Sequence, residues 1–180
     1  EGAAAMTPLT FTLKAAPQQR LDLSPLTPEI LKGLSLKAIG AIEVQTTKEK
    51  IAIGDLFHIG GNDPSRLRII GGLAGFDGIC TAMASGAIFV EGDAGSRLGR
   101  SMRGGSIAVT GNAGVWCGSG MKAGRIAIGG NAGDWIGGPL AGEMAGMSGG
   151  LIHVKGNAGA EAGQRMRRGT IAIGGDAGDY

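Results

Sequence analysis

The residue types that most often carry chemistry are few and scattered in this chain. Its two histidines, His58 and His153, lie far from each other and from any carboxylate cluster, which favours solvated or interface histidines over catalytic ones. Its two cysteines, Cys80 and Cys117, form no Cys-x-x-Cys pair and have no basic neighbours, so we expect buried side chains rather than a disulfide, a metal site or a reactive thiol. Residues Gly118–Ala123 match the G-x-G-x-x-A dinucleotide pattern, but they lie inside a repeat and not in a βαβ unit. We therefore predict no catalytic, metal-binding or cofactor-binding residue.

The composition excludes several classes of protein. Glycine accounts for 37 of 180 residues, but six prolines without a triplet period exclude collagen, and 43% hydrophobic residues exclude a disordered chain. A net charge of +2 does not suit a nucleic-acid-binding protein. Two cysteines without a disulfide framework indicate a reducing cytoplasm. With neither an apolar run of about 18 residues nor a signal peptide, the sequence predicts no membrane contact.

An internal repeat organises most of the chain. The step x-Ala-Gly recurs with its last glycine 20, 19, 19, 26 and 19 residues apart, from Gly75 to Gly178. From the second copy onward, a short apolar strand with β-branched first and third residues precedes each step: Ile88–Val90, Ile107–Val109, Ile126–Ile128, Ile152–Val154 and Ile171–Ile173. Five methionines share another position of the repeat: Met83, Met102, Met121, Met147 and Met166. Period two places the Ile, Val and Met residues inward and the middle residue of each strand outward.

The repeat predicts an all-β fold. A unit of about 19 residues cannot bury its own apolar face, but stacked units share a continuous core. We expect residues 67–180 to form a right-handed parallel β-helix, with seven inserted residues between Gly137 and Met147 forming a loop. Glycines would provide positive φ or close backbone approach at its corners. The Asp or Asn before each Ala-Gly would tolerate left-handed turns and bond its own backbone.

Residues 1–66 do not repeat and are expected to cap the β-helix with a small mixed segment. Glu1–Ala5 is interpreted as a remnant before a natural start at Met6, and the chain is expected to continue beyond Tyr180, where a further coil has begun. The expected elements are a strand around Phe11–Leu13, a helix capped by Thr27 that ends near Lys32 and Gly33, strands at Ile42–Val44 and Ile51–Ile53, and a turn at Asn62–Ser65.

One column of the repeat gathers large side chains two residues after each Ala-Gly step. Its members are Arg97, Trp116, Trp135, Glu161 and Tyr180. The side chains either fill a groove on the solenoid or form a partly exposed ridge. Because the coils leave little interior room for an indole, we favour the ridge, with Arg97, Trp116, Trp135 and Tyr180 as a candidate partner interface.

A second group is basic and lies close to the methionines. It comprises Arg100, Arg103, Lys122, Arg125, Arg165, Arg167 and Arg168. These residues form either a solvated surface or a strip for a polyanionic ligand or an acidic partner.

The iterated unit Gly-Asn/Asp-Ala-Gly-x3-Gly-x2-Met-x2-Gly resembles the GXGXG β-helix domain of the glutamate synthase large chain and of the C subunit of formylmethanofuran dehydrogenases. The segments Leu9–Leu13, Leu21–Leu23, Leu26–Glu29 and Gly54–Phe57 are similar to the C subunit of the bacterial formyltransferase/hydrolase complex of methylotrophs. The resemblance extends from about Leu9 to Tyr180. In glutamate synthase the domain ends a much longer polypeptide, whereas this chain has its own capping segment, which favours a separate subunit.

The resemblance implies a non-catalytic scaffold in the oxidation of one-carbon units. Partner subunits would include a formyltransferase, a metal-dependent amidohydrolase-like subunit and a dehydrogenase-like subunit. They would use tetrahydromethanopterin, a methanofuran-type carrier with an acidic tail and a divalent metal. Two alternatives stay open: the C subunit of an archaeal-type tungsten or molybdenum formylmethanofuran dehydrogenase, and a free-standing β-helix binding protein.

Overall fold

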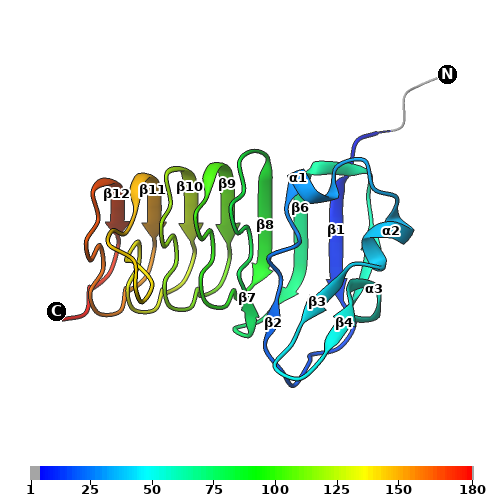
Figure 1. Ribbon diagram of the computed structural model, residues 1–180, viewed down its shortest axis with the longest axis horizontal. Helices are drawn as coiled ribbons and strands as arrows, with labels where there is room; N and C mark the ends of the chain where they lie inside the picture. Colours follow the sequence, from blue (N-terminus) through cyan, green and yellow to red (C-terminus); the bar gives the residue numbers. More distant parts are fainter. Residues whose placement is uncertain (1–4, 180) are drawn as a thin grey trace.

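The structure of the chain is a computed structural model that describes residues 5–179. It contains one large sheet formed by β1 (Pro8–Leu13), β5 (Phe57–Gly60), β6 (Asp63–Gly72), β8 (Ala87–Gly92), β9 (Arg103–Val109), β10 (Ala123–Ile128), β11 (Ser148–Val154) and β12 (Arg168–Ile173). The spatial order is β12-β11-β10-β9-β8-β6-β1-β5, and only β5 runs antiparallel to its neighbour (Figure 1). The prediction of a mostly β chain built on parallel strands is confirmed.

The remaining elements are short and lie mainly in the N-terminal third. Strands β2 (Leu21–Asp22) and β7 (Phe76–Asp77) pair in parallel, and β3 (Glu43–Gln45) pairs antiparallel with β4 (Lys50–Ala52). The helices are α1 (Pro28–Leu31), α2 (Leu36–Gly40) and α3 (Ile53–Leu56). Strand β1 lies between β6 and β5, so the N-terminal segment extends the sheet of the repeats.

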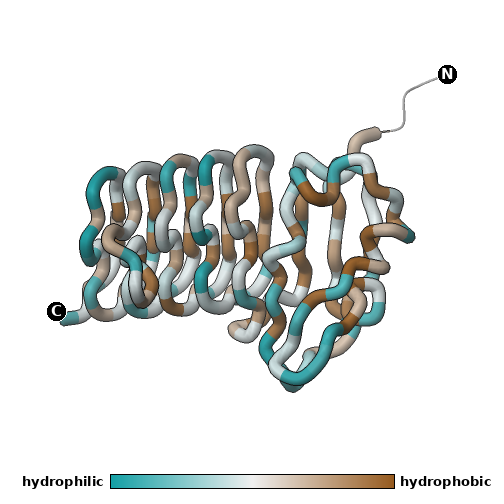
Figure 2. Tube along the Cα trace, in the orientation of Figure 1, coloured by the Kyte–Doolittle hydropathy of each residue, from teal (hydrophilic) through white to brown (hydrophobic). Residues whose placement is uncertain are grey.

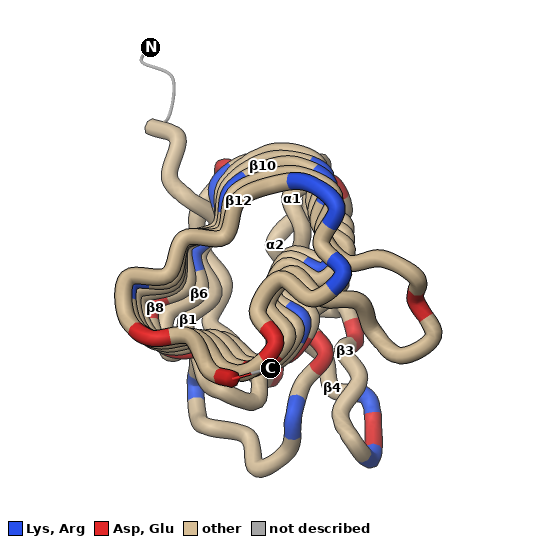
Figure 3. The backbone as a smooth tube through the Cα atoms, turned by 90° about the vertical axis from the view of Figure 1, so that its left-hand side faces the viewer, with Lys and Arg blue, Asp and Glu red and all other residues tan. Residues whose placement is uncertain are grey.

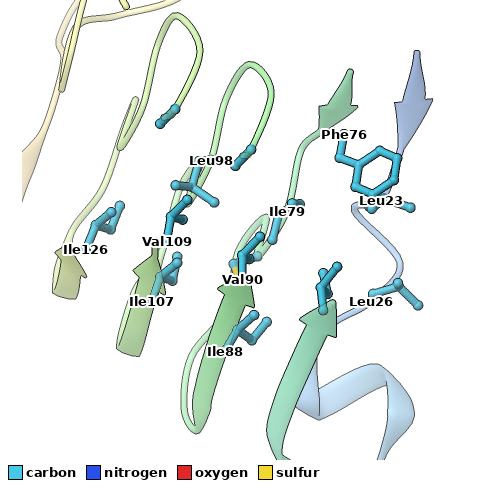
Figure 4. Close-up of a cluster of buried hydrophobic side chains, with 14 of the residues drawn as sticks. Leu23, Leu26, Phe76, Ile79, Ile88, Val90, Leu98, Ile107, Val109 and Ile126 are labelled. Atoms are coloured by element: carbon cyan, nitrogen blue, oxygen red, sulfur yellow. The ribbon is translucent and has the colours of Figure 1, made fainter. Parts of the chain in front are cut away.

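The five predicted repeat strands all form, because each alternates inward Ile or Val residues with an outward residue. Register is kept from strand to strand, with Ile88 opposite Ile107 and Ile107 opposite Ile126. The Ile and Val residues of β8 to β11 and four methionines are buried, which stabilises the fold by about 1.5–3 kcal/mol for each side chain. Figure 4 shows Ile88, Val90, Ile107 and Val109 in this core, and Figure 2 shows the apolar segments recurring along the strands. In β12, the edge strand of the described sheet, Ile171 and Ile173 are half-buried.

The Asp and Asn residues before each Ala-Gly step connect neighbouring coils. The backbone N–H of Asn112 donates to Asp93 Oδ1 at 2.8 Å, and that of Asn131 donates to Asn112 Oδ1 at 2.8 Å. The expectation that these residues bond their own backbone in left-handed turns is wrong. None of these three residues has positive φ, and the side-chain oxygens of Asp93 and Asn112 accept from the backbone of the next coil instead of their own.

Glycines of the repeats show both predicted features, positive φ and close approach of the backbone. At Gly124 φ is +98°, a conformation that residues with a side chain rarely adopt. At Gly133 φ is ordinary, but a Cβ would lie 2.9 Å from the carbonyl carbon of Gly114 and from the N of Val115 in the preceding coil. The second type of glycine sets how closely the coils stack.

The N-terminal helix follows its sequence signals. Thr27 caps α1 by accepting a hydrogen bond from the N–H of Ile30, Pro28 occupies the first turn, and Gly33 beyond the helix has a φ of +79°. The side chain of Glu29 accepts hydrogen bonds at 2.8 Å from the N–H groups of Ala84 and Ser85. Helix α1 is thereby attached to the segment immediately before β8.

Two local predictions for this segment are wrong. The turn expected at Asn62–Ser65 is largely strand, because β6 begins at Asp63 and pairs there with Pro8 of β1. The strand expected at Ile51–Ile53 ends at Ala52, and Ile53 begins α3. The predicted boundary between residues 66 and 67 falls inside β6.

Candidate interaction surfaces

The tryptophan column is aligned by the backbone of successive coils. The N–H of Trp116 donates to the carbonyl of Asp134 at 2.9 Å, and that of Trp135 donates to the carbonyl of Ala160 at 2.9 Å. The two indoles stack with centroids 4.8 Å apart and planes 18° apart. Both rings are half-buried, while the next residue in each coil, Cys117 or Ile136, is fully buried. The tryptophans therefore lie on the outside of the coils as a stacked pair.

A backbone feature of this column was not predicted from the sequence. Arg97, Trp116, Trp135 and Glu161 all have positive φ, between 55° and 59°. This conformation is unfavourable for a residue with a Cβ and persists only where the surrounding structure imposes it. The stacked coils thus impose the backbone conformation from which both indoles project.

The other members of the predicted interface differ in their surroundings. Arg97 is exposed and lines a small polar hollow of about 180 Å³ with Asp22 and Arg100. Tyr180 lies outside the described residues. The structure thus brings the two tryptophans together and places Arg97 one coil away in the same column.

The predicted basic residues lie in three different surroundings. The N–H groups of Arg103, Lys122 and Arg167 occupy equivalent positions, each donating at 2.8 Å to a methionine carbonyl of the preceding coil. We call these three exposed residues the basic column; Ser148 interrupts it, and Arg165 and Arg168 lie beside its last member. Arg125 lies instead at the start of β10, opposite Ser106. Arg100 forms an ion pair with Glu143 of the insertion.

The predicted insertion loop extends from Gly138 to Gly146 and projects from the side of the coils (Figure 3). Glu143 holds it to the coils, because its carboxylate accepts hydrogen bonds from Arg100 and from the N–H of Leu140. The hydrogen bond from Arg100 lowers the pKa of Glu143. At the tip of the loop, Met144 is 84% exposed.

The substitution Glu143→Gln is expected to release this loop from the coils. Because the pKa of Glu143 is lowered in the folded chain, the ion pair stabilises the docked loop above the unfolded pKa and is lost as the pH falls through the folded pKa. The pair is partly solvated, so global stability should fall by less than about 1 kcal/mol. Limited proteolysis should instead cut the loop several-fold faster in the variant at pH 7, and faster in the parent chain once the pH falls through the lowered pKa of Glu143. Equal cleavage rates of variant and parent at pH 7 would contradict the account.

The two cysteines are buried, as predicted, and the two histidines are exposed. Cys80 and Cys117 are fully buried free thiols, and burial raises the pKa of Cys117 to about 12 and that of Cys80 well above its usual value. His58 and His153 are exposed on strands β5 and β11. Within residues 5–179, no three His, Cys, Asp or Glu side chains are grouped so that they could hold a metal ion. None of the helices in the same range is long and apolar enough to cross a membrane.

The chain is similar to known proteins of one enzyme complex. No protein-family model matches the chain. Over 89 residues it is 41% identical to the C subunit of the formyltransferase/hydrolase complex Fhc of Methylorubrum extorquens, an alignment that covers 49% of this chain and 34% of that protein. It also matches a chain in the crystal structure of the formyltransferase/hydrolase complex FhcABCD of M. extorquens with methylofuran, with a TM-score of 0.89, 40% identity and 93% of this chain covered. The resemblance to the C subunit of the formyltransferase/hydrolase complex is confirmed.

The similarity to the solved chain covers both the N-terminal segment and the repeats. Since 93% of this chain aligns, the match extends through the N-terminal segment as well as the repeats. The chain spans about a third of the length of the Fhc C subunit in the sequence alignment and 63% of the length of the solved chain.

Proposed function

We propose that this chain is a non-catalytic structural component of a formyltransferase/hydrolase complex in one-carbon metabolism. The observation that carries the proposal is the fold match to a chain of FhcABCD at 40% identity. The isolated histidines and buried thiols of the described residues agree with a scaffold, because they form no nucleophile–base arrangement.

We further propose that the repeats form a right-handed parallel β-helix from residue 67 onward, capped by the segment up to residue 66. The parallel pairing of β8 to β12 and the bridges Ala113–Ala132 and Ala132–Ala158 support it, since each coil bonds to the next on more than one side. The end-on view in Figure 3 shows the coils superposed. A rigid rod of this kind presents the same surface position at regular spacing to several partners.

In this proposal the chemistry belongs to partner subunits. A formyltransferase subunit moves a formyl group from tetrahydromethanopterin to a methanofuran-type carrier, and a metal-dependent amidohydrolase-like subunit adds water and releases formate. The complex also contains a dehydrogenase-like subunit, and we place the whole assembly in the cytoplasm. The match to M. extorquens favours this complex over an archaeal-type tungsten or molybdenum dehydrogenase. Metal analysis of the purified complex distinguishes the two, because tungsten or molybdenum is expected only in the second.

The proposal is tested by activity measured with and without this chain. The purified chain alone should transfer no formyl group and release no formate. The partner subunits purified without it should show reduced assembly and reduced coupling of transfer to formate release, and adding the chain back should restore both. Full activity of the partners without this chain would contradict a scaffold role, as would activity of the chain alone.

We also propose that the tryptophan pair contacts a partner subunit and that the basic column guides the acidic tail of the carrier. Reversing Arg103, Lys122 and Arg167 to glutamate should then raise the KM for the carrier at low salt by about tenfold or more, and the difference should shrink as salt screens the charges. Reversal of Lys50, an exposed cation of β4 outside the repeats, is the control. Unchanged carrier kinetics of the triple variant at low salt would remove this role.

A further inference from the structure

An apolar groove of about 430 Å³ crosses the outer face of the large sheet, away from the tryptophans. Phe89, Ala108 and Ala127 form part of its lining, and Arg66, Arg68 and Arg125 also line it. We call it the outer groove. The middle residue of each strand was predicted to face outward, but the sequence analysis did not recognise that these outward residues form a hollow.

The groove arises from a step in side-chain size along one row of the sheet. Phe89 lies opposite Ala108, Ala108 opposite Ala127, and Ala127 opposite His153. Two alanines thus lie between two larger side chains, and Phe89 keeps 40% of its surface exposed. An apolar side chain of a partner would fit over the alanines and cover the ring of Phe89.

The charged residues around the groove indicate which charge a partner segment bound there would carry. Arg66 already binds Asp63 at 2.7 Å, and Arg68 binds Glu91 at 3.0 Å while its guanidinium lies 5.8 Å from the ring centroid of Phe89. Arg125 is exposed and forms no ion pair with any residue of the described range 5–179. A carboxylate beside the apolar side chain would complement Arg125.

The position of the groove favours a protein segment over a small molecule. Strands β8, β9 and β10 are interior strands whose backbone groups pair with neighbours on both sides, so an occupant binds through side chains and cannot add a strand. The lining residues extend from Pro8 of β1 to Ala127 of β10, four strand spacings or about 19 Å, on an outer strand face. Small ligands prefer clefts that bury most of their surface, whereas a short protein segment suits an open face.

We propose that the outer groove is the docking surface for a segment of another subunit of the complex, one that presents an apolar side chain next to an aspartate or glutamate. This inference rests on the proposed function, and it adds a partner contact on a different face from the tryptophan pair.

The test uses cysteine accessibility in the complete complex. The native thiols are fully buried, so a maleimide should report introduced cysteines over a low background. Ala127→Cys lies in the groove, and Ala172→Cys is the matched control, because it has the same position in the repeat on β12 but does not line the groove. Each variant is labelled as a free chain and again after co-expression and co-purification with the other subunits of the complex.

We expect Ala127→Cys to be labelled in the free chain and at least tenfold more slowly in the complex, with Ala172→Cys labelled at similar rates in both. If a complex forms and Ala127→Cys is labelled equally fast in it, the inference is wrong while the proposed function stands. Failure to recover any complex overturns the proposed function and this inference with it. Slow labelling in the free chain together with a dimer on a sizing column would assign the groove to a second copy and overturn the inference.

A charge variant tests the proposed carboxylate separately. Arg125→Glu should weaken binding of the partner subunits about tenfold, and the loss should shrink at high salt. Thr170→Glu is the control, because Arg125, Leu151 and Thr170 follow one another in register across β10, β11 and β12. Unchanged partner affinity for Arg125→Glu would overturn the assignment of an acidic occupant.

Discussion

Replacing Gly133 with alanine is expected to lower the free energy of unfolding by about 3 kcal/mol. The added Cβ would lie 2.9 Å from the carbonyl carbon of Gly114 and 2.9 Å from the N of Val115, and both atoms are backbone of the preceding coil. A flexible side chain could move aside, but the carbonyl group of Gly114 is itself part of the hydrogen bonding between coils, because its oxygen accepts from the N–H of Gly133 at 3.2 Å. Urea or thermal unfolding of the purified chain measures the effect.

The matched control for this substitution is Gly60→Ala on β5. A Cβ at Gly60 would have no heavy atom within 4 Å, and the residue has no positive φ. Its stability should change by no more than about 0.5 kcal/mol. If the two alanine variants unfold at the same denaturant concentration, the close stacking of coils at the Ala-Gly step does not stabilise the fold as argued.

Replacing both Trp116 and Trp135 with alanine is expected to raise the Kd of the chain for its partner subunits by about 1000-fold. Aromatic residues at the centre of an interface contribute about 2 kcal/mol or more each, and 1.4 kcal/mol corresponds to a factor of ten. The two indoles are held in place by the stacking between them and by a backbone imposed by the coils, so little ordering is required on binding. Analytical sizing of the reconstituted complex and titration by calorimetry measure the loss.

A loss of folding must be separated from a loss of binding in the tryptophan variant. The circular dichroism spectrum and unfolding midpoint of the free double variant should stay close to those of the parent, because both rings lie outside the core. Glu161→Ala, in the same column with a φ of 55°, should leave assembly unchanged. Normal assembly of the double tryptophan variant would exclude the pair as an interface anchor.

The regular part of the fold could be predicted from the sequence because its determinants are local and repeated. The alternation of Ile107 and Val109 sets the inward face of a strand, and its recurrence in each repeat gives a parallel register without knowledge of distant contacts. The same holds for α1, where Thr27 and Pro28 mark the start of the helix within two residues.

The features that were missed depend on contacts between distant residues. Strand β6 begins at Asp63, inside a segment with turn-forming residues, because β1 pairs with it from more than fifty residues away. The ion pair between Arg100 and Glu143 joins residues 43 positions apart. Both tryptophans adopt positive φ although their residue type disfavours it, because the stacked coils require it. Sequence position alone therefore grouped Arg100 and Arg125 with the basic column, whereas the structure places Arg100 against the loop and Arg125 beside the outer groove.

The central claim is that this chain is a scaffold subunit of a formyltransferase/hydrolase complex. Its most direct test is co-expression of the untagged chain with the partner subunits, with the affinity tag placed only on the formyltransferase subunit. We predict that this chain of 18.0 kDa co-elutes with the tagged subunit in a fixed ratio through affinity purification and gel filtration. Elution of the chain as a separate monomer, with the other subunits assembled without it, would contradict the account.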